Sequence, residues 1–258
     1  MTQGSLEIRT LERADEMSAV VTMFQQVWGS VTPLVGVEVL RAIAHSGGYV
    51  AGAFEHGNII GASFGFLARH DGRPALHSHV TGILPGVQHS GVGRAMKNHQ
   101  RAWAAEQGLE WVTWTFDPLV RRNAWFNLEV LHARVAEYLV DFYGPMSDAV
   151  NRQDETDRLL VAWRVPGDTA GDTGDTGDTD ATDATGATGD TGDDAGGSDD
   201  PIEVDTPEDI VKLRRTDPNA AMEWRHRVRA ELGRRLDAGA RVVGFTREGA
   251  YLVVGGPG

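Results

Sequence analysis

Residues 167–200 place the strongest limit on how this 258-residue chain can fold. The segment consists only of Gly, Asp, Thr, Ala and Ser, so it has no large apolar side chain to bury. Burial there cannot offset the entropy that ordering would remove, and we predict a disordered, self-repelling Gly/Asp/Thr linker. The folded structure must therefore be built from residues 1–166 and 201–258.

The same segment accounts for the acidity of the chain. The formal net charge is −13, and the 11 aspartates of residues 167–200 leave only −2 for all other residues. A nearly neutral folded part is not expected to bind nucleic acid. Aspartates recur at 172, 175 and 178, as in a calcium loop, but the segment lacks the closing bidentate Glu, which favours the linker.

Composition and the N-terminus indicate a cytoplasmic protein with no membrane partner. No apolar run approaches the ~20 residues that a spanning helix needs, and MTQGSLEIRT lacks the pattern of a secretory signal. The chain has no cysteine, which excludes disulfides, thiolate metal sites and cysteine nucleophiles. An apolar share of 41% is sufficient for a core.

Hydrophobic periodicity predicts alternating strands and helices in the first part of the chain. Residues 92–107 form the clearest helix, with Val92, Ala95, Met96, His99, Ala102 and Trp103 on one buried face and Gly108 at its end. The predicted elements are strand 5–10, helices 14–28 and 35–45, a hairpin of strands 49–55 and 59–67, strand 75–84, helix 92–107, strand 111–116, helix 121–133, and strands 135–143 and 158–165.

The last part of the chain is predicted to add helices and two strands. Thr206-Pro207 and Asp217-Pro218 each place a capping residue before a proline, the signature of a helix start. The second helix should run to about residue 238, followed by strands 241–245 and 251–254. So small a segment with few large apolar side chains is marginal alone, so we expect it to dock on the preceding residues.

One stretch carries most of the functional information: Gly82–Met96, GILPGVQHSGVGRAM, leads from an apolar strand through glycines into a helix. Unpaired N–H groups and the helix dipole suit such a turn to a phosphate. A dinucleotide-binding motif is disfavoured because Met96 stands where the third glycine belongs, and no Gly-Lys-Ser/Thr follows for a nucleotide-binding P-loop. A tight connection without a ligand is the remaining alternative.

Gln88-His89-Ser90-Gly91-Val92-Gly93 matches the Gln/Arg-x-x-Gly-x-Gly/Ala signature of the GNAT superfamily of acyl-CoA N-acyltransferases, and the order of elements over residues 5–165 resembles that family's order. The resemblance implies an α+β fold with a twisted, mixed, mostly antiparallel sheet flanked by helices. Residues 1–166 would be the acyltransferase domain, 167–200 the linker and 201–258 a small helical/β extension. WTFDPLVRRNAWFN and RVVGFTREGAYLV further resemble a GNAT subgroup often encoded beside N-acylamino-acid racemases.

The resemblance also implies a co-substrate, acetyl-CoA or another acyl-CoA, and no metal. The pantetheine arm would lie where strands 75–84 and 111–116 splay apart, and the pyrophosphate would lie at the glycine turn. The implied coenzyme-binding residues are Ile83, Leu84, Gln88, His89, Ser90, Gly91, Val92, Gly93, Arg94 and Asn123.

The implied reaction is direct attack by the amine of a small molecule, with an amino acid among the candidates, on an acetyl or succinyl thioester. The amine needs a base. His77 and His79 share a strand face, and His79, closer to the expected acyl position, is our candidate, although strand histidines are more often structural. We expect no two-histidine metal site, because no carboxylate is placed to complete it. The family's usual tyrosine position holds Leu128, which leaves Tyr138, Tyr143 or water as the acid.

Two other functions stay open at this point. The missing tyrosine allows a catalytically idle acyl-CoA-binding module, and the near-neutral surface does not exclude a protein-lysine acetyltransferase. A homodimer is also open, as is docking of the extension on its own domain or on a neighbour's.

Overall fold

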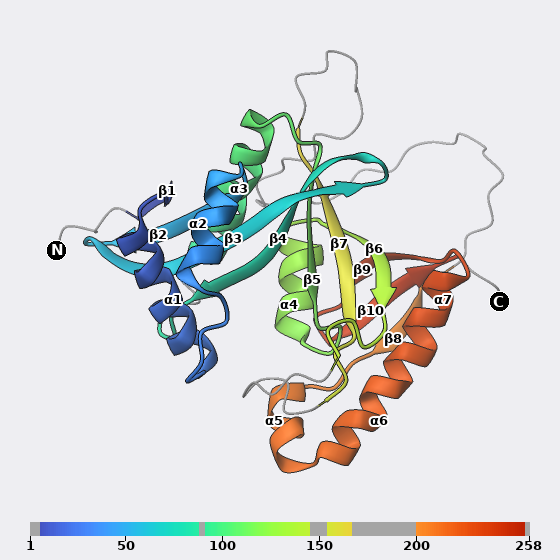
Figure 1. The fold of residues 1–258 in the computed structure, drawn as a ribbon. Coiled ribbons are helices and arrows are strands. Elements are labelled where there is room, and N and C mark those ends of the chain that lie inside the picture. The colour runs from blue at the N-terminus through green and yellow to red at the C-terminus, as the bar shows by residue number, and fades with distance from the viewer. Residues whose placement is uncertain (1–5, 88–90, 145–153, 167–199, 256–258) are drawn as a thin grey trace, which may run out of the picture.

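The computed structural model describes residues 6–87, 91–144, 154–166 and 200–255 (Figure 1). The predicted linker lies outside these residues except for Asp200. In chain order the elements are β1 (Glu7–Thr10), α1 (Ala14–Trp28), α2 (Val37–His45), β2 (Tyr49–Glu55), β3 (Asn58–His70), β4 (Arg73–Ile83), α3 (Val92–Glu106), β5 (Trp111–Phe116), α4 (Arg121–Trp125), the π-helical turn η1 (Phe126–Val130), β6 (Arg134–Leu139), β7 (Arg158–Arg164), β8 (Ile202–Asp205), α5 (Ile210–Thr216), α6 (Pro218–Val228), the π-helical turn η2 (Arg229–Gly233), α7 (Arg234–Asp237), β9 (Arg241–Phe245) and β10 (Ala250–Val254).

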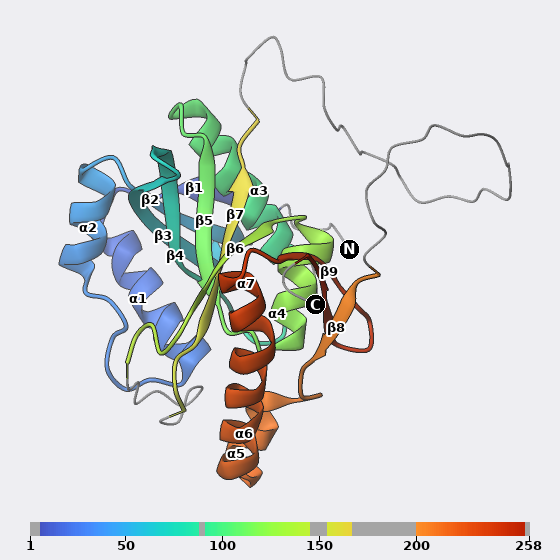
Figure 2. The same ribbon diagram turned by 90° about the vertical axis from the view of Figure 1, so that its right-hand side faces the viewer.

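The strands form a seven-stranded sheet in the order β1-β2-β3-β4-β5-β7-β6 and a three-stranded sheet in the order β8-β10-β9. Every pairing in the large sheet is antiparallel except β4 with β5. Figure 2 shows α1 and α2 on one face of this sheet and α3 and α4 on the other. The predicted mixed, mostly antiparallel α+β fold is confirmed. Within the described ranges, no helix is long and apolar enough to cross a bilayer.

The larger hydrophobic core joins the sheet to the last part of the chain. It contains Trp114 and Leu159 of the large sheet together with Leu232 of η2 and Tyr251 of β10. Polar contacts add to this packing, because the Tyr251 hydroxyl donates to the Pro118 carbonyl at 2.8 Å. Residues 201–255 therefore pack on the described part of the first segment. The proposed domain boundaries themselves stay a prediction.

The predicted helix start at Thr206-Pro207 is wrong. Residues 202–205 form β8, a strand that the sequence did not predict, and the Thr206 hydroxyl, which is buried, donates to the Gly249 carbonyl. The helix begins later, at Ile210, where the Asp209 carboxylate accepts from the Lys212 N–H at 2.9 Å. The start at Asp217-Pro218 is confirmed, with Asp217 accepting from the Ala220 N–H at 3.0 Å.

The predicted strand 135–143 is too long, since β6 ends at Leu139. The chain turns at Asp141, which has a φ of 43° and whose carboxylate accepts from the Thr156 N–H at 3.0 Å. This turn brings Tyr143 back against β5, with its hydroxyl 3.0 Å from the Thr115 hydroxyl. The predicted helix 121–133 is likewise shorter and ends in the π-helical turn η1.

Four buried charged side chains hold the last part of the chain in place. Asp117, just after β5, and Asp154, ahead of β7, face Arg214 of α5 and Arg225 of α6. The Arg225 guanidinium lies 2.8 Å from a carboxylate oxygen of each aspartate. Burial alone would raise the pKa of Asp117, but the charges and hydrogen bonds of the two arginines outweigh it and hold that pKa well below its usual range.

We expect Arg225→Met to destabilise the fold by about 3–5 kcal/mol, because it leaves two buried carboxylates under-compensated. Arg227→Met, on the same helix, removes surface contacts only, namely an i,i+4 pair with Glu231, a 4.0 Å ion pair with Asp205 and a cation–π contact with Trp224, and should change stability by about 1 kcal/mol or less. Urea unfolding of both variants measures the difference. Equal effects at the two positions would contradict the structural role of the buried cluster.

Candidate active site

The site begins where β4 and β5 separate. The two strands pair in parallel over three residue pairs, the last of which is His77 with Thr113. Beyond this pair no ladder joins them in the described structure, and Figure 1 shows β4 running away from β5. β4 also bulges here, because His79 has no register partner in β3, and a bulge bends the strand that contains it. The expected splaying of these strands is confirmed.

The end of β4 leads into the glycine turn and helix α3. Gly91 precedes the helix with a φ of 82°, and a Cβ added to it would meet no atom within 4 Å. A Cβ on Gly93 would lie 3.2 Å from Ile83 Cδ1, so glycine allows α3 to pack closely on the end of β4. The first turn of α3 has no acidic residue. The predicted strand and helix are therefore present, and Gly91 has a left-handed conformation at the helix start.

The other coenzyme-binding residues expected from the sequence surround this turn, except that Gln88, His89 and Ser90 lie outside the described residues. Val92 is buried, and Arg94 is exposed on the first turn of α3. The Leu84 N–H already donates to the Ile60 carbonyl at 2.9 Å, so this donor is used within the sheet.

Asn123 comes from a different element, α4, and is half-buried. It precedes Phe126 by three residues and so lies on the same side of the helix. The Phe126 ring is 3.8 Å from the Cβ position of Gly93, which places this side of α4 next to the start of α3. The two elements therefore meet at the turn, although no described contact ties the Asn123 side chain to it.

The two predicted histidines do share one face of the sheet. Their ring centroids are 6.3 Å apart, and His77 Nδ1 lies 3.1 Å from the Thr113 hydroxyl. The ring of His79 lies 5.4 Å from that of Phe64, which packs in the core beneath α1. His79 is exposed and His77 half-buried, so His79 is the one that a ligand can reach more easily.

The surroundings favour the neutral form of both imidazoles, because the pKa of each is lowered. The pKa of His77 is lowered to about 4, mainly by burial and to a smaller extent by the charges of the nearby His79 and Lys97. Partial burial also lowers the pKa of His79. Neither shift has a carboxylate among its causes. A neutral imidazole can accept a proton, which is what a general base requires.

A buried lysine that the sequence analysis missed lies on the opposite face. Lys97 Nζ donates to the Ser78 hydroxyl at 3.0 Å and to Gln100 Oε1 at 3.2 Å, and it lies 3.9 Å from the Trp114 ring centroid. Burial lowers its pKa to about 7. The Gln100 amide in turn donates to the Ser63 hydroxyl at 3.3 Å. This network therefore spans α3, β3, β4 and β5.

The predicted buried face of α3 is accordingly only partly right. Val92 and Met96 are buried, but Ala102 is exposed. Lys97 and Gln100 are buried instead, so the helix is rotated toward them. Their i, i+3 spacing was visible in the sequence, but charge and polarity argued against burial.

The structure separates the two tyrosines that were candidates for the acid. Tyr138 is buried, its hydroxyl donates to Asp157 Oδ2 at 2.7 Å, and burial raises its pKa well above the usual range. Tyr143 is 38% exposed, and its ring lies 6.3 Å from that of His79. Leu128 is buried. Only Tyr143 of the two lies beside the predicted base.

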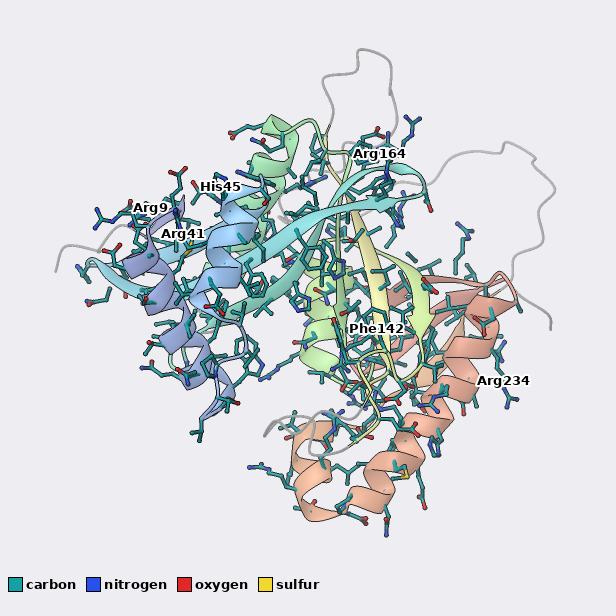
Figure 3. All side chains as sticks on the ribbon, viewed as in Figure 1. Arg9, Arg41, His45, Phe142, Arg164 and Arg234 are labelled. Carbon is teal, nitrogen blue, oxygen red and sulfur yellow. The ribbon has the colours of Figure 1, made fainter. Side chains whose placement is uncertain are left out.

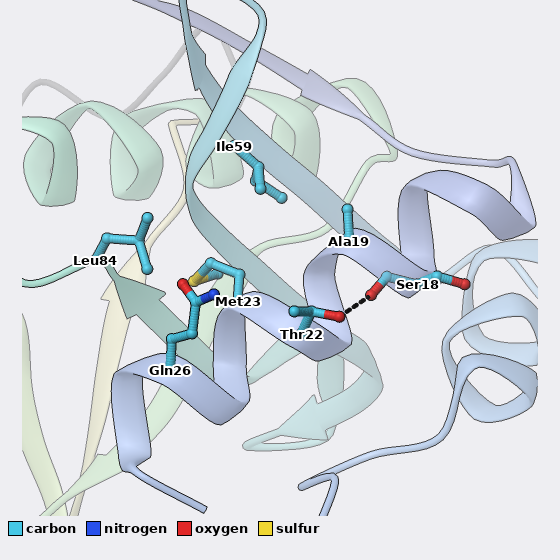
Figure 4. A pocket seen from close by; sticks show the side chains of 7 residues that line it. All are labelled: Ser18, Ala19, Thr22, Met23, Gln26, Ile59 and Leu84. Carbon is cyan, nitrogen blue, oxygen red and sulfur yellow. Dashed lines mark hydrogen bonds between the residues drawn. The ribbon is translucent and has the colours of Figure 1, made fainter.

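A hollow of about 320 Å³ lies between α1 and the ends of β3 and β4 (Figure 4). Leu84 is the one predicted site residue that lines it, and Met23 and Ile59 contribute apolar surface. The Thr22 hydroxyl donates to the Ser18 carbonyl at 3.0 Å within it. Neither His77 nor His79 lines this hollow. In the described ranges, no cluster of three or more His, Asp or Glu side chains could hold a metal ion.

Comparisons with known proteins support the fold. No family model matches the chain, and no curated protein matches its sequence. The ribosomal-protein-S18-alanine N-acetyltransferase of Escherichia coli is 15% identical over 66% of this chain and 98% of its own, with a TM-score of 0.50. An N-acetyltransferase of Staphylococcus aureus Mu50 is 10% identical over 63% and 99%, with a TM-score of 0.51. The yncA protein of Salmonella typhimurium, an assigned acetyltransferase solved with acetyl-CoA, is 16% identical over 64% and 96%, with a TM-score of 0.50. The expected GNAT acetyltransferase fold is thereby confirmed.

We expect Lys97→Met to stabilise the protein more at pH 7 than at pH 10. Between the folded pKa of about 7 and the unfolded value of 10.5, the unfolded chain keeps a proton that the folded chain loses. The free energy of unfolding of the wild type therefore falls by about 1.4 kcal/mol per pH unit as the pH falls from 10.5 to 7. Methionine does not titrate, so the variant lacks this loss of stability.

Urea unfolding at both pH values measures the effect, with Lys212→Met, an exposed lysine, as the matched control. The lost hydrogen bonds to Ser78 and Gln100 shift both measurements equally and cancel in the comparison. A stability change for Lys97→Met that is the same at pH 7 and pH 10 would contradict a low folded pKa.

Proposed function

We propose that this chain is an N-acyltransferase that moves an acetyl or succinyl group from acyl-CoA to the amine of a small molecule. The observation that carries the proposal is that β4 separates from β5 after His77 and then leads, past its end at Ile83, to Gly91 at the start of α3. A helix start suits the pyrophosphate, and separated strands leave room for an extended pantetheine arm. The signature Gln88–Gly93 and the GNAT fold support the same assignment.

The residues around the turn suit an anion. Gly91 opens onto space where a phosphate could approach the backbone, and Gly93 keeps α3 close to Ile83. The first turn of α3 lacks a carboxylate and includes the exposed Arg94. Val92, Leu84 and Asn123 complete the proposed coenzyme site, together with the proposed ligands Gln88, His89 and Ser90.

The proposed chemistry is direct attack of the amine nitrogen on the thioester carbonyl. A C–N bond forms, the C–S bond breaks, and the thiol of coenzyme A leaves. An ammonium group has a pKa near ~10, so a base must take its proton, and we assign this role to His79. Tyr143, beside His79, is the side chain that we assign to reprotonate the leaving thiolate.

A homodimer stays open, and a cytoplasmic location remains a prediction of the sequence. So does the small-molecule acceptor, since the E. coli relative is named for a ribosomal-protein alanine. We retain a small molecule as our proposal because the exposed histidine face is lined by aromatic side chains.

Gly91→Ala tests the coenzyme site. Gly91 and Gly108 both have left-handed φ values, 82° and 68°, and an added Cβ meets nothing within 4 Å at either position. Each substitution should therefore cost about 1–2 kcal/mol of stability at opposite ends of α3. Calorimetric titration with acetyl-CoA and succinyl-CoA should show at least about tenfold weaker binding for Gly91→Ala alone.

Absence of acyl-CoA binding by the wild type would overturn the proposal, and equal weakening by Gly108→Ala would remove the turn from the site. Binding without thiol release in the presence of any amine would indicate an idle acyl-CoA-binding module.

His79→Gln tests the base. We expect kcat to fall by about 10²-fold or more, because general-base catalysis contributes that much. Since the pKa of His79 lies below 6.5, kcat of the wild type should rise with pH below 6.5, and the variant should lose this limb. Acetyl-CoA affinity should not change. His45→Gln, at an exposed position on α2, is the control, and an unchanged pH profile in His79→Gln would exclude the assigned role.

A further inference from the structure

The face that carries His79 is walled by aromatic rings from two separate parts of the chain. Phe66 of β3 lies 5.3 Å from the ring of His77 and 5.6 Å from that of His79. From the other side Tyr143, after β6, lies 6.3 Å from His79, and Phe142 lies 4.7 Å from Tyr143. Figure 3 shows Phe142 in front of β5 and β7. The rings therefore flank the predicted base on two sides.

These rings are open to solvent although they gather around one point. Phe66 is 41% exposed, Tyr143 38% and Phe142 47%. Exposed aromatic side chains that cluster at a candidate site mark a place where an apolar ligand can bury surface. Polar groups on β5 do not compete for such a ligand, because Thr113 and Thr115 are already bonded to His77 and Tyr143.

The charges around this face indicate which kind of amine it can hold. In the part of the chain that the structure describes, neither His77 nor His79 forms an ion pair with a carboxylate, since the histidine ion pairs there involve His70 and His226. The face therefore offers no described anion beside the base to anchor a second ammonium group. A cation near Tyr143, Arg158, is buried, lies 5.3 Å from the Tyr143 ring centroid and donates to the Asp157 carbonyl at 2.9 Å. Lys97 lies on the opposite face of the sheet. The face thus offers apolar surface and a neutral base, with little charge for recognition.

We infer that the acceptor is a primary amine on an uncharged apolar or aromatic body, which stacks between Phe66 and the Phe142–Tyr143 pair with its nitrogen at His79. This inference rests on the proposed acyltransferase function and specifies its acceptor. A polyamine or another polycation, which needs carboxylates, is a poor substrate for such a site, and so is an amine that carries a carboxylate.

Three primary amines that differ in charge and in apolar body test the inference with acetyl-CoA as donor. Phenethylamine has the aromatic body alone, phenylalanine adds a carboxylate, and spermidine replaces the ring with further ammonium groups. We expect kcat/KM for phenethylamine to exceed that for either of the others by about tenfold or more, since apolar contacts of this size give such ratios. A preference for spermidine or for phenylalanine would overturn the inference.

Two variants connect the preference to the rings. Phe66→Ala and Phe142→Ala should each raise KM for phenethylamine about tenfold while leaving acetyl-CoA affinity unchanged. Leu67→Ala is the matched control, because Leu67 is 52% exposed on the same strand but points to the opposite face from Phe66. Titration of phenethylamine into protein saturated with coenzyme A gives the same comparison without turnover.

The outcomes also separate this inference from the proposed function. If acetyl-CoA does not bind, the acyltransferase proposal fails first. If acetyl-CoA binds and another class of amine releases thiol, the acyltransferase proposal stands and the inference about the acceptor fails. An equal effect of Leu67→Ala and Phe66→Ala would also overturn the role of the ring wall.

Discussion

The parallel pairing of β4 with β5 ends at His77 and Thr113, and the arrangement of the candidate site depends on that end. In this sheet the other strands pair in antiparallel ladders, so one short parallel contact is the place where the sheet can open. The bulge at His79 bends β4 away from its neighbour. The opening then leads along β4 to the glycine turn and the first residues of α3.

Different chemistry lies on the two faces beside this opening. On one face Lys97 bonds Ser78 of β4 and lies over Trp114 of β5, which connects the two strands from beneath just past their last pair. On the other face the neutral imidazole of His79 is open to solvent among aromatic rings. A buried amine and an exposed base thus lie across one sheet, and the charge of Lys97 helps to keep His77 neutral.

The last part of the chain supports this site from its far end. Asp117 follows β5 directly, and Asp154 lies ahead of β7. Arg225, from a helix more than 100 residues after Asp117, binds both carboxylates. Such buried ion pairs add little net stability, yet their geometry is demanding, so they fix where the ends of the two strands lie. Next to them, Asp157 accepts from the Asp141 N–H and so holds the turn before Tyr143.

Local patterns in the sequence determined the elements and the phosphate-like turn, because periodicity, caps and glycines act within a few residues. The helix at 14–28 and the strand at 111–116 have the predicted bounds, and Gly91 has the left-handed conformation expected of a turn glycine. Tertiary contacts decided the rest: Thr206 follows a strand that pairs with β10, and Lys97 is buried where α3 packs on Ser78 of β4 and Trp114 of β5. The position of Tyr143 beside His79 also depends on tertiary contacts. Hydrogen bonds from Thr156 to Asp141 and between Thr115 and Tyr143 fix the turn after β6 that brings Tyr143 there. No short stretch of sequence encodes such a contact between distant strands.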